Sequence, residues 1–233
     1  MTSAFSCRPS APARLSCGLG EVHVWRVSLD GLAWAEERLG HVLAGEERER
    51  ASRFAAPTDR RRYITRRAAL RVILAHYLDT SPAELCFRSD SHGKPRLESE
   101  AGPASLRFNV SHSEGLALYS ISRGRETGVD VERIRRHLAS PWIAKRFFPP
   151  DEVARLRQLP EDSYAGAFFV CWTRVEARLK AWGRGLGAAT GGGTGDCSAL
   201  TVHELAPGRG YAGALAVEGH DHRLVFWDLT CPS

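Results

Sequence analysis

The chain has 233 residues, of which 43% are hydrophobic and 25% are charged, and its formal net charge is +5 at pH 7. This balance is typical of a globular protein. No segment approaches the roughly 20 consecutive apolar residues of a membrane-spanning helix, so we expect no membrane partner. The positive charge favours an anionic partner, such as a nucleic acid, a phosphorylated small molecule or an acidic protein. Charge alone does not distinguish these from a basic surface without a binding role.

The first twenty residues differ in composition from the rest of the chain. They are rich in Ser, Ala, Pro and Arg, contain no acidic residue and lack the apolar segment of a secretory signal. We expect residues 1–20 to form a disordered leader, with a transit peptide as the second interpretation. The six cysteines include no Cys-x-x-Cys pair and have no histidines at zinc-binding spacing. Scattered thiols of this kind indicate a reducing compartment, here the cytoplasm.

Up to residue 97, hydrophobic periodicity and turn residues predict strands and helices in alternation. In chain order these are a strand over 21–29, a helical segment over 32–54 with a break near Gly45, a long helix over 58–78, and a short strand within 85–97 followed by a turn at Gly93-Lys94-Pro95. Thr58 or Asp59 is the expected cap of the long helix. The first half of this helix is strongly basic, with Arg60, Arg61, Arg62, Arg66, Arg67 and Arg71.

The remainder of the chain is predicted to contain two hairpins and a second long helix. The elements are a hairpin of 116–122 with 127–132, short helices over 140–148 and 149–159, a long helix over 163–183, a flexible glycine-rich loop over 183–196, and a hairpin of 210–217 with 222–229. Strands and helices do not alternate regularly, which favours an α+β fold. A boundary near 124–128 would give an N-terminal half over 21–125 and a C-terminal half over 126–233.

Asp130 and Glu132 are separated by one residue in a predicted strand, so their side chains share one face. Two carboxylates side by side repel each other unless a positive charge lies between them, and a hard divalent cation is the natural occupant. Magnesium takes one or two carboxylates and fills its other positions with water and phosphate oxygens. A solvated outer face is the commoner role of a bare Asp-x-Glu pattern.

Glu176 and Lys180 lie four residues apart in the second long helix, beside its apolar stripe. They could form an ordinary ion pair worth roughly 0.2–0.5 kcal/mol. Alternatively, Glu176 could join the two carboxylates of the strand as a third acid. Lys180 is one of only three lysines in the chain, which hints at a specific need for an ammonium group.

His112 lies between Ser111 and Ser113, just before a predicted strand. A core or turn histidine is the commoner role, but hydroxyls, an imidazole and backbone N–H groups near a strand start also make a phosphate pocket. Lys94 lies on a turn from which its ammonium could reach a diphosphate. The basic helix could alternatively bind nucleic acid, although it lacks the interleaved aromatic residues of a stacking platform.

Five short motifs occur in a fixed order along the chain: "GKP" (93–95), "FNVSHS" (108–113), "GVDVE" (128–132), "FFPPDE" (147–152) and "WTRVEARLKAWGRGL" (172–186). In this order and spacing the chain resembles the surfactin-type 4′-phosphopantetheinyl transferases, over about residues 46 to 186. Each motif alone is a weak signal, whereas five in order at compatible spacing are a strong one.

The resemblance implies a monomer with two similar-sized halves related by a pseudo-two-fold axis, each a small sheet packed on a long helix. Its active site would lie in the cleft between the halves. The implied activity is transfer of the 4′-phosphopantetheine group of coenzyme A to a serine of an apo acyl or peptidyl carrier protein. The second product is adenosine 3′,5′-bisphosphate, and fatty acid, polyketide and non-ribosomal peptide carriers all remain open.

By the same resemblance, Asp130, Glu132 and Glu176 hold Mg²⁺ against the diphosphate of coenzyme A. Catalysis is implied for Glu176, as general base, and for Lys180, which supports the leaving phosphate. The implied contacts to coenzyme A come from Lys94 and Pro95 of the turn, Lys180, Ser111, His112, Arg62 and Arg50, of which Ser111 and His112 contact the 3′-phosphate and Arg62 assists His112.

Two positions depart from the family pattern. Val175 stands where the family usually has lysine before the helix glutamate, so either a phosphate or carrier contact is missing or Arg174 substitutes. Glu47 stands where the best-known members have a basic residue. The alternative to a transferase is therefore a non-catalytic family member that binds coenzyme A or a carrier protein without transfer.

Overall fold

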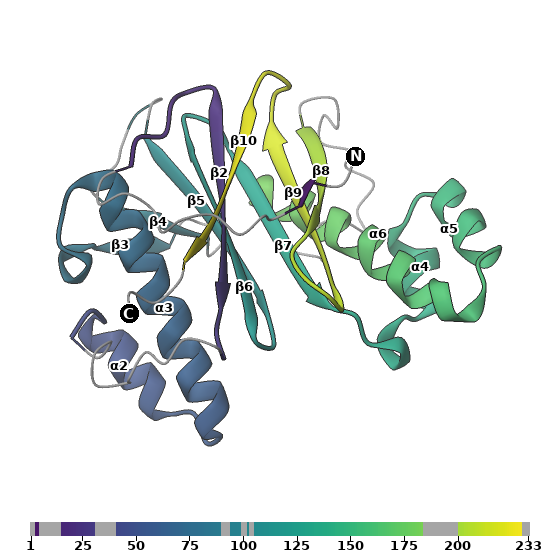
Figure 1. The fold of residues 1–233 in the computed structure, drawn as a ribbon, viewed down its shortest axis with the longest axis horizontal. Coiled ribbons are helices and arrows are strands. Elements are labelled where there is room, and N and C mark those ends of the chain that lie inside the picture. Colours follow the sequence, from purple (N-terminus) through teal and green to yellow (C-terminus); the bar gives the residue numbers. More distant parts are fainter. Residues whose placement is uncertain are drawn as a thin grey trace.

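In a computed structural model the chain forms two halves, each with a four-stranded sheet and a long helix (Figure 1). The structure describes residues 3–4, 15–30, 41–89, 94–98, 102, 105–183 and 200–229. Helices and strands are mixed without regular alternation, so the predicted α+β class is confirmed. Among the described helices, none is both long and apolar enough to cross a membrane.

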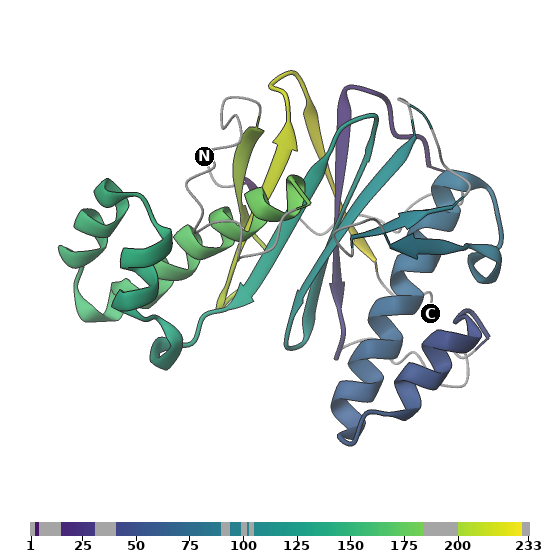
Figure 2. The same ribbon diagram turned by 180° about the vertical axis from the view of Figure 1, so that it is seen from behind.

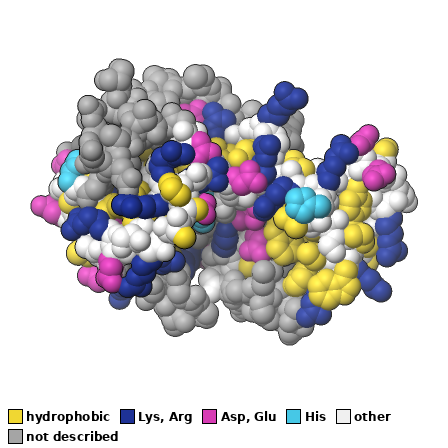
Figure 3. All heavy atoms as spheres, turned by 90° about the horizontal axis from the view of Figure 1, so that it is seen from below, with side chains coloured by type: hydrophobic (Ala, Val, Ile, Leu, Met, Phe, Trp, Pro, Cys, Tyr) yellow, Lys and Arg dark blue, Asp and Glu magenta, His cyan; other side chains and the backbone are white. Residues whose placement is uncertain are grey.

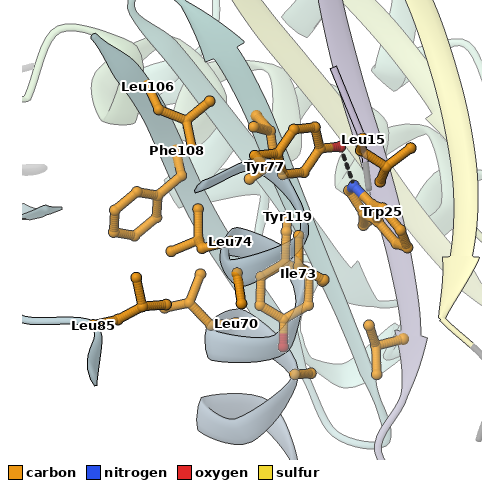
Figure 4. Packing of buried hydrophobic residues seen from close by; sticks show 14 of the residues in the cluster. Leu15, Trp25, Leu70, Ile73, Leu74, Tyr77, Leu85, Leu106, Phe108 and Tyr119 are labelled. Carbon is orange, nitrogen blue, oxygen red and sulfur yellow. Dashed lines mark hydrogen bonds between the residues drawn. The ribbon is translucent and has the colours of Figure 1, made fainter. Parts of the chain in front are cut away.

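The first sheet has the strand order β10-β2-β6-β5. Its strands are β2 (Glu21–Ser28), β5 (Leu106–Ser113), β6 (Leu116–Arg123) and β10 (Arg223–Leu229). Helix α3 (Pro57–Leu78) covers one face, because its apolar stripe packs on the inward side chains of β2 and β6. Trp25 of β2 donates its indole N–H to the hydroxyl of Tyr77 of α3 at 2.8 Å (Figure 4). The polar atom of this buried ring is thereby satisfied.

Four shorter elements complete the first half: α2 (Gly45–Ser52), η1 (Pro82–Glu84), β3 (Phe87–Ser89) and β4 (Pro95–Leu97). Helix α2 packs on α3, and β3 pairs with β4 in a small antiparallel sheet. Strand β4 contacts β5. The small sheet therefore returns the chain from the end of α3 to the edge of the first sheet.

The second sheet has the order β1-β8-β9-β7, with strands β1 (Ser3–Ala4), β7 (Thr127–Arg133), β8 (Leu200–Ala206) and β9 (Tyr211–Glu218). Helix α6 (Glu161–Ala181) lies across β7 and β9 (Figure 2). The elements η2 (Arg136–Leu138), α4 (Pro141–Phe147) and α5 (Pro150–Arg157) lie between β7 and α6 in the chain. A Cβ atom at Gly128 of β7 would lie 2.1 Å from the carbonyl oxygen of Ala177, so only glycine permits this close helix–strand contact.

The two halves repeat one topology. In each, a strand of the four-stranded sheet is followed by the long helix and, later in the chain, by two more strands of that sheet, the last of which pairs antiparallel with both others. Strands β2, β6 and β5 thus correspond to β7, β9 and β8. An apolar layer that includes Val24, Leu118, Val129 and Leu215 joins the two sheets. The predicted fold of two related halves, each a sheet on a long helix, is confirmed.

Both predicted hairpins are wrong. Strand β6 lies between β2 and β5, whereas β7 pairs with β9 in the other sheet. The short connection over 124–126 passes from one sheet to the other, because the apolar residues of β6 and β7 meet in the layer between the sheets. Strand β10 likewise leaves β9 and pairs in parallel with β2. The last strand of the chain therefore belongs to the first sheet.

Several strands and one helix start also differ from expectation. The sequence pattern does not predict β1, β4, β5 or β8, and His112 lies within β5 rather than before a strand. Polar residues at alternate positions of β5 conceal the strand, since they contact β7 rather than solvent. Helix α3 begins at Pro57 with Ala56 as its N-cap. The predicted caps Thr58 and Asp59 are wrong because proline already occupies a first-turn position that needs no N–H partner.

Several expectations fall at the limits of the described residues. Within the predicted leader, Ser3–Ala4 form β1 and pair with β8, and Leu15 and Cys17 are buried in the core beside α3. The expected disorder therefore does not extend to 3–4 or 15–20. The predicted helix start at 32 and nearly all of the glycine-rich loop over 183–196 lie outside the described residues. The division of the chain near residue 125 stays a prediction.

Candidate active site

Strands β5 and β7 run side by side where the halves meet, and side chains connect them. Val129 N–H donates to Asn109 Oδ1 at 2.9 Å, Val131 N–H to Ser111 Oγ at 3.3 Å, and Arg133 N–H to Ser113 Oγ at 3.1 Å. Successive bonds are two residues apart on both strands, so they follow the strand period. Along this edge of β7, polar side chains of β5 therefore take the place of the backbone hydrogen bonds that two paired strands would form.

The two serines also fix the carboxylates of β7. Ser111 Oγ donates to Asp130 Oδ1 at 2.8 Å, and Ser113 Oγ donates to Glu132 Oε2 at 2.8 Å. Each hydroxyl therefore accepts a backbone N–H and donates to a carboxylate, which uses both functions of the group. Asp130 and Glu132 lie two residues apart on β7 and both accept hydrogen bonds from β5, as expected for side chains on one face of the strand.

Lys180 of α6 bonds to the same group. Its Nζ donates to Asp130 Oδ1 at 2.7 Å and to Ser111 Oγ at 2.9 Å. Among the described residues no ion pair joins Lys180 to Glu176, so an isolated ion pair within the helix is not the arrangement found. Asp130 is 3% exposed, and its Oδ2 is buried without a hydrogen-bond partner in the described part of the chain.

Glu132 and Glu176 are half-buried and influence one another electrostatically. Burial raises the pKa of Glu176, and the negative charges of Asp130 and Glu132 raise it further, whereas Lys180 lowers it. Burial likewise raises the pKa of Glu132, opposed by the hydrogen bond from Ser113. The three acids thus share one region, although no three His, Cys, Asp or Glu residues of the described chain are already grouped as a metal site.

Lys94 is buried and joins the two halves. Its Nζ donates to Glu126 Oε2 at 2.9 Å, to the carbonyl oxygen of Thr127 at 3.1 Å and to that of Lys180 at 3.1 Å. The ammonium therefore binds the start of β7 and the last turn of α6. In this position it also holds the backbone from which the side chain of Lys180 reaches Asp130.

Two cavities beside α3 form a basic hollow, and His112, the neighbour of Ser111, lines one of them. A cavity of about 300 Å³ is lined by Arg62, Tyr63, Arg66 and His112, among others. A second cavity of about 460 Å³ shares Tyr63 and Arg66, and its other lining residues are Glu46, Glu47, Arg50, Arg67, Phe87, Arg88 and Pro95. In Figure 3, acidic and basic side chains meet between the two lobes of the molecule. Charged groups and aromatic rings in this combination suit a phosphorylated nucleotide.

The predicted residues of this hollow differ in their partners. Part of His112 is exposed, but the protein around its ring removes hydration, and this effect together with the charges of Arg66 and Lys180 lowers the pKa of His112 to about 4. At neutral pH it is therefore an uncharged donor or acceptor. Arg62 makes a two-pronged contact with Asp30, at 2.8 and 2.7 Å, and the guanidinium of Arg50 lies 5.7 Å from the ring centre of Tyr63.

Sequence reasoning missed Arg66 as a site residue. Its Nε is buried and has no hydrogen-bond partner among the described residues, and burial lowers its pKa. In the sequence it is one of six arginines on a single helix, so its position offered no distinguishing signal. Only the geometry shows that Arg66 lies in the wall common to both cavities.

Glu47 and Val175, the two residues that depart from the family pattern, both make defined contacts in the structure. Glu47 is buried and forms ion pairs with Arg67 and Arg71, the latter at 2.7 Å. An acid at this position therefore orients two arginines of α3. Arg174 pairs with Glu152 and lies 3.5 Å from Glu204, while Val175 packs in the apolar cluster of α4, α5 and α6. The charge of Arg174 is therefore already paired within the protein, which argues against Arg174 as a substitute for the missing lysine.

Comparisons with known proteins agree with the motifs. Residues 126–224 match the model of the 4′-phosphopantetheinyl transferase superfamily, and residues 32–121 match that of a 4′-phosphopantetheinyl transferase N-terminal domain. The chain is 35% identical to the 4′-phosphopantetheinyl transferase HetI of Nostoc sp. over 93% of its own length and 95% of that protein. The chain belongs to the 4′-phosphopantetheinyl transferase superfamily.

More distant relatives match parts of the chain. It is 29% identical to a phosphopantetheinyl transferase of Thraustochytrium sp., over 71% of the chain and 62% of that protein. It is 26% identical to the 4′-phosphopantetheinyl transferase Sfp of Bacillus subtilis, over 64% of each chain. The predicted resemblance to the surfactin-type family is therefore confirmed.

Replacing Lys94 tests whether its ammonium stabilises the contact between the start of β7 and the last turn of α6, which we call its bracing role. Lys94→Met removes one of the cations that pair with Glu126 and the donor that joins Thr127 O to Lys180 O. Because Arg96 still pairs with Glu126, we expect the free energy of unfolding to fall by about 1–3 kcal/mol. Urea unfolding followed by circular dichroism measures this change. Lys145→Met, at an exposed lysine of α4, is the matched control and should leave stability unchanged. Equal stability of the two variants would contradict the bracing role.

Proposed function

We propose that this protein transfers the 4′-phosphopantetheine group of coenzyme A to a serine of an apo carrier protein and releases adenosine 3′,5′-bisphosphate. Family membership supports the reaction. The single structural observation that supports the site is Asp130 Oδ2, a buried carboxylate oxygen without a partner among the described residues, beside Glu132 and Glu176. Such atoms are rare in proteins unless a ligand completes them.

The donor set fits Mg²⁺. Asp130 would bind the ion through Oδ2, and Glu132 and Glu176 would complete the carboxylate ligands directly or through water, as magnesium prefers. Mutual repulsion, which contributes to the raised pKa of Glu176, would be relieved by a dication. When bound, the ion supplies positive charge that neutralises the diphosphate oxygens.

The basic hollow is the proposed site for the nucleotide part of coenzyme A. His112, Arg62 and Arg66 would surround the 3′-phosphate, with Arg50 and Pro95 further along the hollow. Uncharged His112 can donate one hydrogen bond, and the nearby phosphate would raise its pKa. Ser111 and Lys180 link this region to the acids, so Lys180 is placed to contact the diphosphate. The ammonium of Lys94 is bonded to three groups of the protein. Its predicted direct contact with the diphosphate therefore stays a prediction.

The chemical step is a displacement at the β-phosphorus. The serine oxygen of the carrier forms a bond to phosphorus while the bond to the bridging oxygen breaks. The electron pair of that bond leaves with the 5′-phosphate of the nucleotide. Glu176 is the proposed acceptor of the serine proton, because it is a half-buried carboxylate beside Asp130 and Glu132. Lys180 would stabilise the charge on the leaving phosphate.

The expected partner is an acidic carrier protein, which the net charge of +5 favours. A monomer in the cytoplasm remains our proposal for its state and location. The second candidate is a non-catalytic family member that binds coenzyme A or a carrier. The observation that favours this candidate is Val175, which packs among apolar side chains and provides no charge to the phosphates.

A transfer assay distinguishes these two candidates. The protein is mixed with coenzyme A, Mg²⁺ and apo carrier proteins from fatty acid, polyketide and peptide synthesis, and each carrier is weighed by mass spectrometry. We expect one carrier to gain the mass of one phosphopantetheine group, and Glu176→Ala to reduce the rate by roughly 10²–10⁴-fold, as loss of a general base does. Tight coenzyme A binding without a mass gain on any carrier would support the non-catalytic candidate.

Arg66 should distinguish coenzyme A from its analogue without the 3′-phosphate. A guanidinium–phosphate bond contributes roughly 1.5–3 kcal/mol, so Arg66→Ala should lower kcat/KM for coenzyme A by about 10–100-fold. With 3′-dephospho-coenzyme A the same substitution should have little effect. Arg61→Ala, at an exposed arginine of the same helix, serves as control. An equal loss with both substrates would place Arg66 away from the 3′-phosphate.

A further inference from the structure

Arg135 occupies a fixed position at the edge of the acidic group. The preceding Ile134 donates its backbone N–H to Gly210 O at 2.9 Å, and the carbonyl of Arg135 accepts the N–H of Leu138 at 3.0 Å. The backbone is therefore held on both sides of the residue. The side chain is half-buried, and its Nε is fully buried with no hydrogen-bond partner among the described residues.

Neighbouring arginines all have partners, which makes Arg135 an exception. The pairs are Arg133 with Glu114, Arg136 with Asp162, and Arg174 with Glu152. Arg135 forms no ion pair with a described residue, although its positive charge is among the influences that lower the pKa of Glu132. The buried Nε–H group therefore lacks the hydrogen bond that buried polar groups normally make, and an oxygen atom of a ligand would supply it.

The acids lie between two cations along β7. Lys180 bonds to Asp130, in the middle of the strand, and to Ser111, whose neighbour His112 lines the nucleotide hollow. Arg135 follows Glu132 by three residues, beyond the end of the strand. A diphosphate also has two ends. Its nucleotide end would therefore meet Lys180, and its pantetheine end would extend toward Arg135.

We propose that Arg135 binds a non-bridging oxygen of the β-phosphoryl group, the one that is transferred. This inference rests on the proposed function and names the residue that contacts the migrating group. A guanidinium suits this task because its planar donors match phosphate oxygens and it stays protonated. It also supplies a positive charge that neither Val175 nor the committed Arg174 provides. Arg135 gives up no proton, and the bonds formed and broken are those of the displacement described above.

Binding measurements with two ligands test this contact without relying on turnover. Coenzyme A contains the β-phosphoryl group, whereas adenosine 3′,5′-bisphosphate ends at the 5′-phosphate. By isothermal titration, Arg135→Ala should weaken coenzyme A binding by about 10-fold, the loss of one charge-assisted bond, and leave adenosine 3′,5′-bisphosphate binding unchanged. Lys180→Ala should weaken both ligands.

Kinetics provide the second readout. Arg135→Ala should lower kcat by roughly 10²–10³-fold, as removal of a preorganised donor to a transition-state oxygen does. Arg135→Lys keeps the charge but loses the planar pair of donors, so it should recover part of this loss. Arg136→Ala is the matched control, since the adjacent arginine is exposed and pairs with Asp162 at the surface. It should behave as the unaltered protein.

Each contrary result has a separate meaning. If the unaltered protein transfers the group and Arg135→Ala does so equally well, the Arg135 contact is wrong and the function stands. Equal weakening of both ligands would also overturn the contact, because it would place Arg135 at the nucleotide. If the unaltered protein transfers nothing, the proposed function fails, and the comparison of the two ligands still decides whether Arg135 meets the β-phosphoryl group. Circular dichroism establishes folding, and Arg135→Gln replaces the alanine variant if that one unfolds.

Discussion

The site depends on the side-chain ladder between β5 and β7. Asn109, Ser111 and Ser113 accept the N–H groups of a strand edge that would otherwise be unpaired within the protein. The same two hydroxyls then orient Asp130 and Glu132. One set of residues thus joins the halves and aims the acids. A backbone ladder would satisfy the strand edge equally well, but it would offer no hydroxyl donors to the carboxylates.

A second constraint brings α6 to this ladder. Gly128 allows the helix backbone to rest on β7, and Lys94 binds the end of the helix to the start of the strand. The side chain of Lys180 can then reach Asp130 from the helix that packs on β7. The described residues contain buried, unpartnered atoms of three charged groups in this region, on Arg66, Asp130 and Arg135. Arg66 and Arg135 are cations, and Asp130 is an anion. The two arginines suit the phosphates of a ligand, and Asp130 suits a metal ion bound between them. The packing of the fold thus leads to the chemistry proposed for it.

Sequence patterns predicted the long helices and most strands, because their apolar periodicity reflects burial on one face. They failed where a strand is polar for a tertiary reason. In β5, Ser111 and Ser113 point at another strand and resemble a loop in the sequence. The hairpins failed because β6–β7 and β9–β10 are adjacent in the chain but belong to different sheets. Asp130, Glu132 and Glu176 were proposed as site residues from their motifs. The proposals for Arg66 and Arg135 depend on which arginine lacks a partner, and only the packed structure determines that.

Anomalous diffraction from crystals grown with Mn²⁺ and coenzyme A tests the convergence of the three acids on one dication most directly. The account predicts a single strong peak between the halves, about 2.1 Å from Asp130 Oδ2, with oxygens of Glu132 and Glu176 bonded to it directly or through one water and a diphosphate oxygen completing the site. Bound coenzyme A with the metal peak elsewhere, and with Asp130 and Glu176 turned away from each other, would contradict it.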